Sequence, residues 1–261
     1  MVDSSQPPAP ARPRALVTGA TAGIGHEFAV QLAAAGHDLV LVARDTARLE
    51  RVADELRRTH AVDVEVLTAD LTVREDVTRV EDRLKADAAP VTLLVNNAGF
   101  GLKNRFGDNP LADEQAMLDV LVVAVLRLSH AALEAMSARG RGGIINVSSV
   151  AAFLPRGTYS AAKAYVNSFG RWAHEEYRSR GVVVTTLCPG FTKTEFHQRM
   201  AVKRGSGLMW LDVEFLVREA LADHAKQKTM SIPGAQYKVI IAVTRVVPTS
   251  LLQKLQSIGR R

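Results

Sequence analysis

Short apolar runs alternate with longer amphipathic stretches along most of the chain. Six runs rich in Val, Leu and Ile have the length of buried strands and lie at residues 15–18, 38–42, 64–67, 92–95, 144–147 and 182–187. Apolar residues at helical spacing predict helices over residues 24–35, 47–60, 73–87, 113–139 and 159–180. This alternation predicts an α/β fold with one doubly wound parallel sheet and helices on both of its faces.

The pattern changes after the sixth predicted strand. Residues 190–212 are polar, contain glycine and carry scattered Phe, Met and Trp residues, so we expect this insertion to form a lid over a substrate. A further helix over residues 213–225 and a short strand over residues 230–232 lead into a basic C-terminal segment, residues 234–261.

Composition narrows the class of protein. With 47% apolar and 23% charged residues among 261, the chain has the balance of an ordinary globular protein, which excludes a disordered polyelectrolyte. We expect one domain over residues 14–261, preceded by a flexible Pro-rich leader at residues 1–13. The single cysteine, Cys188, can form neither an internal disulfide nor a multi-cysteine metal cluster, and no metal site is predicted.

The net charge of +6 is concentrated near the C-terminus. Residues 1–195 carry 22 Lys and Arg against 23 Asp and Glu, whereas residues 196–261 carry 11 against 4. A basic end can contact nucleic acid or a membrane surface, but a solvated surface is the commoner reason, and no nucleic-acid partner is predicted. We recognise no secretory signal and no apolar run long enough to span a bilayer. These features predict a cytoplasmic protein, with peripheral membrane contact as the less favoured alternative.

A glycine-rich turn follows the first predicted strand and opens the first predicted helix. It reads Thr18-Gly19-Ala20-Thr21-Ala22-Gly23-Ile24-Gly25. Glycines there allow a tight turn and the close approach of backbone N–H groups to a pyrophosphate, which the helix N-terminus also attracts. The turn therefore indicates a dinucleotide site, and an ordinary glycine-rich turn between a strand and a helix is the alternative.

Arg44 ends the second predicted strand, where an NAD-binding protein has an acidic residue for the ribose. A guanidinium suits a 2′-phosphate, whereas a carboxylate would repel it. Arg44 therefore favours NADP(H) over NAD(H), with a solvated arginine at a helix start as the alternative.

Tyr159 and Lys163 are four residues apart on one face of a predicted helix, after a strand followed by Ser148 and Ser149. A neighbouring ammonium stabilises a phenolate, so we expect Lys163 to lower the pKa of Tyr159 and to suit it for proton transfer. A serine hydroxyl can hold a substrate oxygen within reach. Taken alone, the Tyr159–Lys163 pair is weak evidence for a catalytic site, because a tyrosine on a helix face more often packs in the core.

Several motifs occur together in one order, and with them the chain resembles the short-chain dehydrogenase/reductase family from Arg14 to about Thr194. They are the turn of residues 18–25, Ala69-Asp70-Leu71, Asn96-Asn97-Ala98-Gly99, Ser148-Ser149, Tyr159-Ser160-Ala161-Ala162-Lys163, and Pro189-Gly190 followed by Thr194. The resemblance, to the NADP(H)-type carbonyl and 3-oxoacyl reductases of the family, implies a Rossmann-like fold. It also implies that Tyr159 is the general acid, Ser149 orients the carbonyl and Lys163 binds the nicotinamide ribose.

The same resemblance implies where the rest of an NADP(H) molecule lies. Asp70 and Leu71 would border the adenine, Asn97 would contact the centre of the cofactor, and Thr192 or Thr194 would approach the nicotinamide amide or the diphosphate. From the residues alone, Asp70 is equally well explained as a helix N-cap. The cofactor-binding residues implied in this way are Gly19, Thr21, Gly23, Ile24, Gly25, Arg44, Asp70, Leu71, Asn97, Ala98, Gly99, Tyr159, Lys163, Pro189, Gly190, Thr192 and Thr194.

Two features depart from the family pattern. Leu121 stands where the family usually has an Asn that holds a water linking the catalytic lysine to solvent, and a leucine cannot hydrogen-bond that water. Ser149 precedes Tyr159 by 10 positions, fewer than is common, which leaves Ser148 as an alternative to Ser149. Arg156 in this short loop could meet an anionic substrate, although an exposed loop arginine is the commoner explanation.

The sequence thus predicts an oxidoreductase that transfers a hydride from NADPH to a small-molecule ketone or aldehyde. The apolar residues of the lid suit an apolar or 3-oxoacyl substrate, and the alternative is that they only close the core over the cofactor. In the family, the apolar helix around residues 117–136 and the Tyr159 helix commonly build a two-fold contact, so the resemblance implies a homodimer or homotetramer. The alternative is a catalytically weak dinucleotide-binding sensor or scaffold, which Leu121 supports and the intact Ser149, Tyr159 and Lys163 disfavour.

Overall fold

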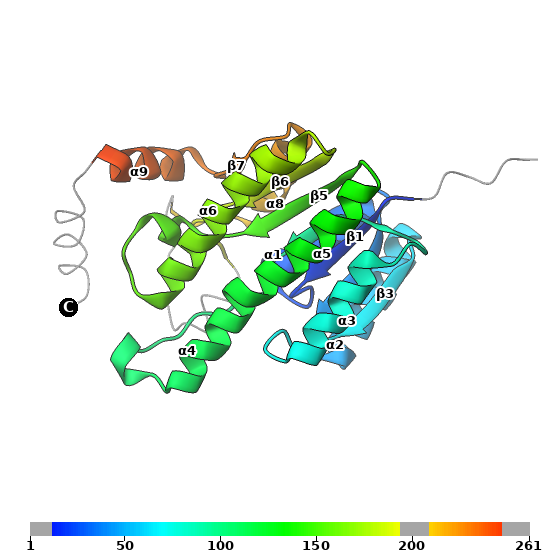
Figure 1. Ribbon diagram of the computed structural model, residues 1–261, viewed down its shortest axis with the longest axis horizontal. Helices are drawn as coiled ribbons and strands as arrows, with labels where there is room; N and C mark the ends of the chain where they lie inside the picture. The colour runs from blue at the N-terminus through cyan, green and yellow to red at the C-terminus, as the bar shows by residue number, and fades with distance from the viewer. Residues whose placement is uncertain (1–11, 194–208, 247–261) are drawn as a thin grey trace, which may run out of the picture.

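Seven parallel strands form one sheet in the computed structural model, which describes residues 12–193 and 209–246. The strands are β1 (Arg14–Thr18), β2 (Asp38–Ala43), β3 (Val64–Thr68), β4 (Val91–Asn96), β5 (Gly142–Val147), β6 (Val182–Leu187) and β7 (Met230–Ser231). Their order is β3-β2-β1-β4-β5-β6-β7 (Figure 1), so the direction of the strand order reverses between β1 and β4. This is the doubly wound parallel sheet that the sequence predicts.

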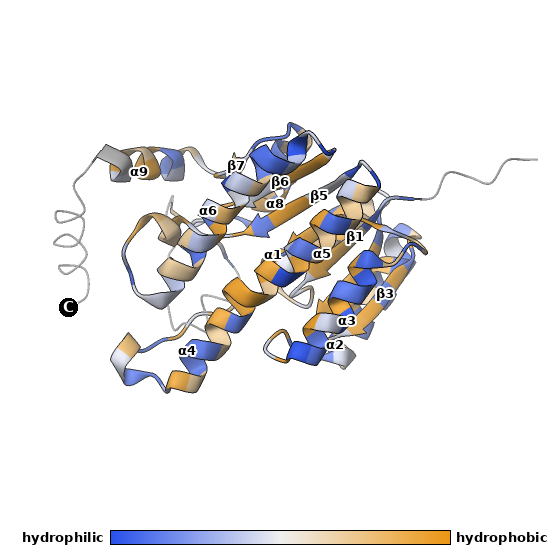
Figure 2. Cartoon of the chain, viewed as in Figure 1, coloured by the Kyte–Doolittle hydropathy of each residue, from blue (hydrophilic) through white to orange (hydrophobic). Residues whose placement is uncertain are grey.

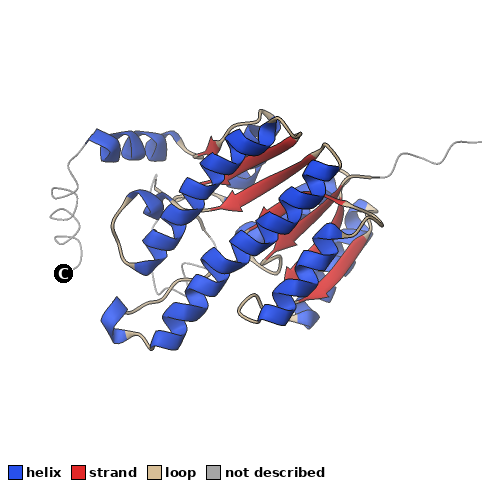
Figure 3. Cartoon of the chain, viewed as in Figure 1, coloured by secondary structure: helices blue, strands red, loops and turns tan. Residues whose placement is uncertain are grey.

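Helices cover both faces of the sheet (Figure 3). One face carries α1 (Gly23–Ala34), α2 (Thr46–His60) and α8 (Val213–Ala225), and the other carries α3 (Arg74–Lys85), α5 (Ala124–Ala138) and α6 (Thr158–Arg178). The remaining elements are α4 (Leu111–Leu118), α9 (Ala235–Val246), the 3-10 turns η1 (Phe106–Asp108) and η3 (Val150–Phe153), and the π-helical turn η2 (Asp119–Val123).

The two helical layers bury separate apolar clusters against the sheet. Phe28 and Leu49 belong to the cluster under α1, α2 and α8, whereas Leu128 and Met136 belong to the cluster under α3, α5 and α6. Figure 2 shows hydrophilic residues on the outer side of α3 and largely hydrophobic strands behind this helix. Burying a Leu, Phe or Met side chain contributes roughly 1.5–3 kcal/mol. The alternation of apolar runs and amphipathic stretches therefore drives the layered arrangement.

The helix predicted over residues 113–139 is divided in the structure. α4 and α5 continue each other through η2, a π-helical turn of five residues, and the three elements look like one long rod in Figure 1. A π turn inserts an extra residue into a helix and rotates the residues after it relative to those before it. The regular 3.6-residue spacing read from the sequence could not reveal this local change.

The same rod, Leu111–Ala138, is long and apolar enough, by length and composition, to cross a membrane. The expectation that no apolar run is long enough to span a bilayer is therefore wrong. The charged residues of this rod are widely spaced, so that one window of 18 residues contains at most two of them. However, 56% of that window is buried inside the fold. A core helix packed against a sheet passes the same test, which makes the membrane evidence weak.

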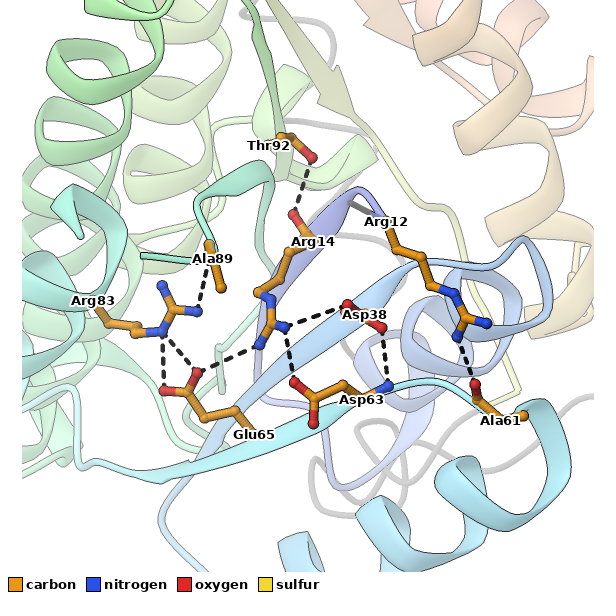
Figure 4. A network of polar contacts seen from close by, with 9 residues as sticks. All are labelled: Arg12, Arg14, Asp38, Ala61, Asp63, Glu65, Arg83, Ala89 and Thr92. Carbon is orange, nitrogen blue, oxygen red and sulfur yellow. Dashed lines mark hydrogen bonds and ion pairs between the residues drawn. The ribbon is translucent and has the colours of Figure 1, made fainter. Parts of the chain in front are cut away.

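A polar network joins the strands at the edge of the sheet where they begin (Figure 4). Arg14, the first residue of β1, donates to Asp63 Oδ2 at 2.8 Å and to Asp38 Oδ2 at 3.3 Å. Its second terminal nitrogen lies 3.8 Å from Glu65, which also accepts from Arg83 at 2.8 Å. Because Arg14 is buried, its loss would leave carboxylates without their partner, which typically costs about 3–5 kcal/mol. The network ties β1, β2 and β3 together away from the ends where a ligand can bind.

Three predicted segments fall mainly outside the described residues. These are most of the leader at residues 1–13, the central part of the lid at residues 194–208, and the end of the basic segment at residues 247–261. The described beginning of the basic segment forms α9. The described ends of the lid lie side by side, since Thr192 and Leu211 form an isolated parallel bridge. The proposed roles of leader, lid and basic segment stay predictions.

Candidate active site

A cleft of about 430 Å³ opens at the carboxyl ends of the strands, beside the reversal of the strand order. Ligands of doubly wound sheets bind at such a point, and the volume is in the range of small-molecule sites. The site residues singled out from the sequence that line it are Gly19, Thr21, Gly23, Ile24, Arg44, Asp70, Leu71, Asn97, Ala98, Gly99, Ser149, Tyr159, Lys163, Pro189, Gly190 and Thr192. Gly25 does not line the cleft, and Thr194 lies outside the described residues.

Thr18 and Asn97 tie the glycine-rich turn to the end of β4. The Thr18 hydroxyl accepts from the Asn97 backbone N–H at 2.9 Å, and the Asn97 amide donates to the Thr18 carbonyl oxygen at 2.9 Å. Gly19 has a φ of +67°, in the left-handed region that favours glycine. A Cβ on Gly25 would lie 2.3 Å from Asn97 Nδ2, so Gly25 permits close packing behind the turn instead of facing the cleft.

The first turn of α1 directs hydrogen-bond donors towards the cleft. Gly23 and Ile24 line the cleft at the start of this helix, and Ala22 before them has no polar side chain that could cap the first turn. The uncapped backbone N–H groups and the positive end of the helix dipole attract anions. The residues present therefore fit the pyrophosphate of a dinucleotide.

Two arginines line the cleft beside the end of β2. The Arg44 side chain is 69% exposed, and its Nη1 lies 3.9 Å from Asp70 Oδ2. Arg48 stands in the first turn of α2, which Asp45 caps by accepting from the Arg48 backbone N–H at 3.0 Å. Guanidinium groups suit phosphate oxygens. Sequence reasoning missed Arg48, although its position four residues after Arg44 was a usable signal.

A local turn places Asp70 on the cleft wall. Its Oδ1 accepts from the Thr72 backbone N–H at 2.9 Å and from the Thr72 hydroxyl at 2.8 Å. Helix α3 begins only at Arg74, with Val73 in the N-cap position. The interpretation of Asp70 as a helix cap is therefore wrong, because its side chain closes a turn before the helix.

Ser149, Tyr159 and Lys163 meet at the other end of the cleft. Ser149 follows β5, and the first turns of α6 carry Tyr159 and Lys163. The side chains of Ser149 and Tyr159 are hydrogen-bonded, and Lys163 Nζ lies 5.8 Å from the centre of the Tyr159 ring. Lys163 is buried and donates to the Val147 carbonyl oxygen at 2.7 Å. The arrangement brings two hydroxyls and one ammonium to the same part of the cleft.

The two neighbouring serines have different partners. The Ser148 hydroxyl is buried and donates to the Lys163 carbonyl oxygen at 3.0 Å. The Ser149 hydroxyl accepts from the Ala151 backbone N–H at 3.1 Å and is hydrogen-bonded to Tyr159. The geometry thus favours Ser149 over Ser148 as the serine that faces a substrate oxygen.

Burial dominates the acidity of Tyr159. Removal from water raises the pKa of Tyr159 to about 12, and the hydrogen bond with Ser149 offsets only part of this effect. Burial also lowers the pKa of Lys163 to about 8. The expectation that Lys163 depresses the pKa of Tyr159 is therefore wrong. The Lys163 ammonium donates to the Val147 carbonyl oxygen, and burial is the largest influence on the pKa of Tyr159.

Leu121 packs next to this end of the cleft. Its side chain is fully buried in a small cluster with residues of α4 and α6, against which the Tyr159 ring also packs. A Cβ added to Gly99 would lie 2.8 Å from Leu121 Cδ2 and 3.9 Å from Lys163 Nζ, so the two side chains flank the same backbone. Hydrocarbon thus occupies the position where the family usually has an Asn.

The chain after β6 forms the remaining wall. The Pro189 carbonyl oxygen accepts from the Val150 backbone N–H at 2.9 Å, which links this wall to η3. Gly190 and Thr192 line the cleft, and the Thr192 hydroxyl donates to the Gly190 carbonyl oxygen at 3.0 Å. Thr194, the other residue expected near the nicotinamide, lies outside the described residues.

Several residues that line the cleft were not predicted from the sequence. Those that sequence reasoning did not assign to the site are Val42, Ala43, Asp45, Arg48, Phe100, Gly101, Val120 and Val147. Most are small or apolar residues near the ends of strands, and only the sheet topology brings them together. Arg156, by contrast, is exposed and lies outside the cleft, beside a separate surface hollow.

The single cysteine is a buried core residue. Cys188 is fully buried, and burial raises the pKa of its thiol to about 12. This agrees with a small residue that packs in the fold. Within residues 12–193 and 209–246, no three His, Cys, Asp or Glu side chains are grouped so that they could hold a metal ion.

The profile of the short chain dehydrogenase family matches residues 13–204. The chain belongs to this family. The matched region runs from β1 through the glycine-rich turn, Tyr159 and Lys163 to the wall after β6. Proteins of this family bind a nicotinamide dinucleotide, and the resemblance inferred from the motifs of the chain is confirmed.

Proteins of known structure or assigned activity are similar to this chain. A short-chain dehydrogenase from Sphingobium yanoikuyae, solved in complex with NADPH, is 33% identical with a TM-score of 0.82 over 89% of this chain and 94% of that chain. A bulky-bulky ketone specific alcohol dehydrogenase from Comamonas testosteroni is 30% identical, with a TM-score of 0.79, over 95% of this chain and 94% of the dehydrogenase. A very-long-chain 3-oxoacyl-CoA reductase of Anas platyrhynchos is 35% identical over 190 residues, which are 69% of this chain and 60% of the reductase. The chain thus spans less than two thirds of that reductase.

Proposed function

We propose that this short-chain dehydrogenase uses NADPH to reduce the carbonyl of a ketone or aldehyde. One observation carries the proposal. Ser149, Tyr159 and Lys163 converge at one end of a cleft, and Arg44 and Arg48 line its other end. One end is therefore equipped to transfer a proton, and the other to bind a phosphate.

Each side chain at the reacting end has a separate task. Bound NADPH would supply a hydride to the substrate carbon. The Ser149 hydroxyl orients the substrate oxygen, and the Tyr159 hydroxyl holds the proton that this oxygen takes up. Lys163 keeps a positive charge beside Tyr159 and is placed to bind a ribose hydroxyl. Asn97 fixes the glycine-rich turn through its hydrogen bond to the Thr18 carbonyl oxygen.

The protonation state of Tyr159 is compatible with reduction. Burial raises the pKa of Tyr159 to about 12, so its hydroxyl is protonated at pH 7, as that of an exposed tyrosine is, and holds a proton that a substrate oxygen can take up. Lys163, with a pKa of about 8, is mostly charged at the same pH. Its ammonium can therefore stabilise the phenolate that remains after the proton has left.

Residues at the end of β2 support NADPH over NADH. An NAD-type site has an acidic residue there to bind the ribose. This chain has Arg44 at the corresponding point, and the carboxylate of the next residue, Asp45, is engaged in capping α2. Arg48 adds a second cation to the same wall. The relative from Sphingobium yanoikuyae was solved with NADPH, which supports the same preference.

We propose a bulky apolar ketone, with 3-oxoacyl thioesters included, as the class of substrate. Phe100 and Val120 provide apolar surface in the cleft. Such surface stabilises a bound hydrocarbon chain by about 25 cal/mol for each Å² removed from water. A similar protein is named as a very-long-chain 3-oxoacyl-CoA reductase and another as a bulky-bulky ketone specific alcohol dehydrogenase, which supports this class.

We further propose that two copies pair through α5 and α6, as a homodimer or as half of a homotetramer in the cytoplasm. Leu126 on α5 and Trp172 on α6 are 45% and 53% exposed. Trp172 belongs to a row of aromatic rings, with centroids 5.9 Å from Phe169 and 6.0 Å from Tyr177. Exposed apolar surface of this kind commonly marks a protein interface.

Replacing Tyr159 with phenylalanine tests the function. Because only the reacting hydroxyl is lost, Tyr159→Phe should lower kcat for NADPH oxidation by at least about 100-fold. Its Kd for NADPH, measured by fluorescence titration, should stay within about twofold of the wild-type value. The substrates would be ketones graded from short aliphatic compounds to long 3-oxoacyl thioesters. Tyr177→Phe, which removes a tyrosine hydroxyl from the outer part of α6, is the matched control.

Two results would contradict the proposal. Tight NADPH binding by the wild type without turnover of any carbonyl would favour a dinucleotide-binding sensor. Wild-type turnover that survives in Tyr159→Phe would remove Tyr159 from the mechanism.

A further inference from the structure

A buried tyrosine outside the cleft supports one of the cleft walls from behind. Tyr237, near the start of α9, is only 1% exposed. Its ring packs on Gly190, where an added Cβ would lie 2.0 Å from a ring carbon. Gly190 itself lines the cleft. The aromatic ring therefore fills the space immediately behind the Gly190 backbone, which lines the cleft.

The hydroxyl of Tyr237 joins two stretches of chain that meet at this wall. It accepts from the Phe191 backbone N–H at 2.8 Å and donates to the Met209 carbonyl oxygen. The two stretches are also paired with each other. Leu211 N–H donates to the Phe191 carbonyl oxygen at 2.8 Å, and Lys193 N–H donates to the Leu211 carbonyl oxygen at 3.1 Å. One side chain thus binds a backbone donor and a backbone acceptor from two separate, partly exposed segments.

The contacts continue from this wall to the reacting end. Pro189 precedes Gly190, and its carbonyl oxygen accepts from the Val150 backbone N–H at 2.9 Å. Val150 directly follows Ser149 and begins η3, against which α9 also packs. A shift of Tyr237 would therefore be transmitted to both the wall after β6 and the turn that holds the serine.

We propose that Tyr237 is a positioning residue that fixes the wall of residues 189–192 for binding of the cofactor. This inference rests on the proposed function, since it assigns the wall to NADPH binding. Tyr237 acts through the Gly190 backbone, which its ring supports, and through the Phe191 backbone, which its hydroxyl binds. A phenylalanine would fill the same space but would leave the Phe191 N–H and the Met209 carbonyl oxygen without this partner.

Tyr237→Phe tests the proposal because it removes the hydroxyl and keeps the ring. We expect KM for NADPH to rise roughly 5- to 20-fold and kcat to fall by less than about threefold, since the reacting side chains stay in place. Thr185→Val is the matched control. It removes a buried hydroxyl of β6 that donates to the Lys228 carbonyl oxygen at 2.8 Å and bonds His224 at 2.9 Å, away from the cleft. This control should lose similar thermal stability while its KM for NADPH changes by less than about twofold.

The results separate this role from the proposed function. An unchanged KM for NADPH in Tyr237→Phe, or an equal rise in Thr185→Val, would overturn the positioning role while wild-type turnover still supports the function. A wild-type protein that does not bind NADPH would overturn the proposed function and this role together. If Tyr237→Phe does not fold, the positioning role is tested instead by amide hydrogen exchange of the wild-type protein with and without NADPH. NADPH should slow exchange of the Phe191 and Leu211 amides, and unchanged exchange would overturn the positioning role.

Discussion

Replacing Arg44 with leucine should remove most of the preference for NADPH over NADH. A 2′-phosphate carries close to two negative charges, and a guanidinium about 4 Å away gains about 1 kcal/mol for each charge in bulk water. The Arg44 side chain is 69% exposed, so the bulk value is the appropriate one. The expected loss is therefore about 2 kcal/mol, or about 30-fold in the Kd for NADPH.

Two neighbours of Arg44 change the expected loss of NADPH affinity in opposite directions. Asp70 Oδ2 lies 3.9 Å from Arg44 Nη1, and without the guanidinium this carboxylate would repel the phosphate. Arg48 remains in the cleft wall and would keep part of the attraction. The two effects partly cancel, which leaves about 30-fold as the working estimate.

Fluorescence titration with NADPH and NADH is the assay for Arg44→Leu. The Kd for NADH should change by less than about twofold, because NADH has no 2′-phosphate. Arg58→Leu is the control, since it removes the same charge from an exposed position further along α2. The reasoning would be refuted if Arg44→Leu weakened the binding of NADPH and of NADH equally. It would also be refuted if Arg58→Leu lost as much affinity for NADPH as Arg44→Leu does.

Two further predictions concern stability and assembly. Burial, with a smaller effect of the His174 charge, lowers the pKa of His224 from 6.5 to about 4, so the unfolded chain binds a proton that the folded chain excludes. The contribution of His224 to the free energy of unfolding should be constant above pH 6.5 and fall by about 3 kcal/mol as the pH is lowered to 4. Urea denaturation at several pH values measures this change. A His224→Gln variant that loses as much stability between pH 6.5 and pH 4 as the wild type would contradict the prediction. Trp172→Arg places two charges in the proposed two-fold contact and should raise the dimer dissociation constant at least about 100-fold. Light scattering over a dilution series measures this, and variant dimers that persist at the lowest concentrations would count against the α5–α6 contact.

The sheet and most helices could be predicted because their signals are local. The strand expected at residues 182–187 is β6, with the same bounds, and the helix expected over residues 159–180 is α6, which runs from Thr158 to Arg178. Both depend on the spacing of apolar residues within one segment. The π turn η2 left no trace in that spacing, because a single extra residue in a helix that is apolar on most sides does not disturb the pattern.

Two expectations about the site were wrong for different physical reasons. Asp70 has the residue type of a helix cap, but the structure starts α3 at Arg74 and leaves Asp70 in a turn of its own. The Tyr159–Lys163 spacing correctly placed both residues on one face, yet the sign of the Tyr159 pKa shift depends on burial by other parts of the chain.

The sequence by itself determined the chemistry present: the glycine-rich turn, Arg44 after β2, and the Tyr159–Lys163 pair on α6. Each of these features depends on residues within a few positions of one another, where helix and strand geometry fix the relative placement. Only the tertiary structure decided that Ser149 instead of Ser148 contacts Tyr159 and that Tyr237 supports Gly190. These features depend on burial and on contacts between segments that are far apart in the chain, and local sequence patterns do not encode either.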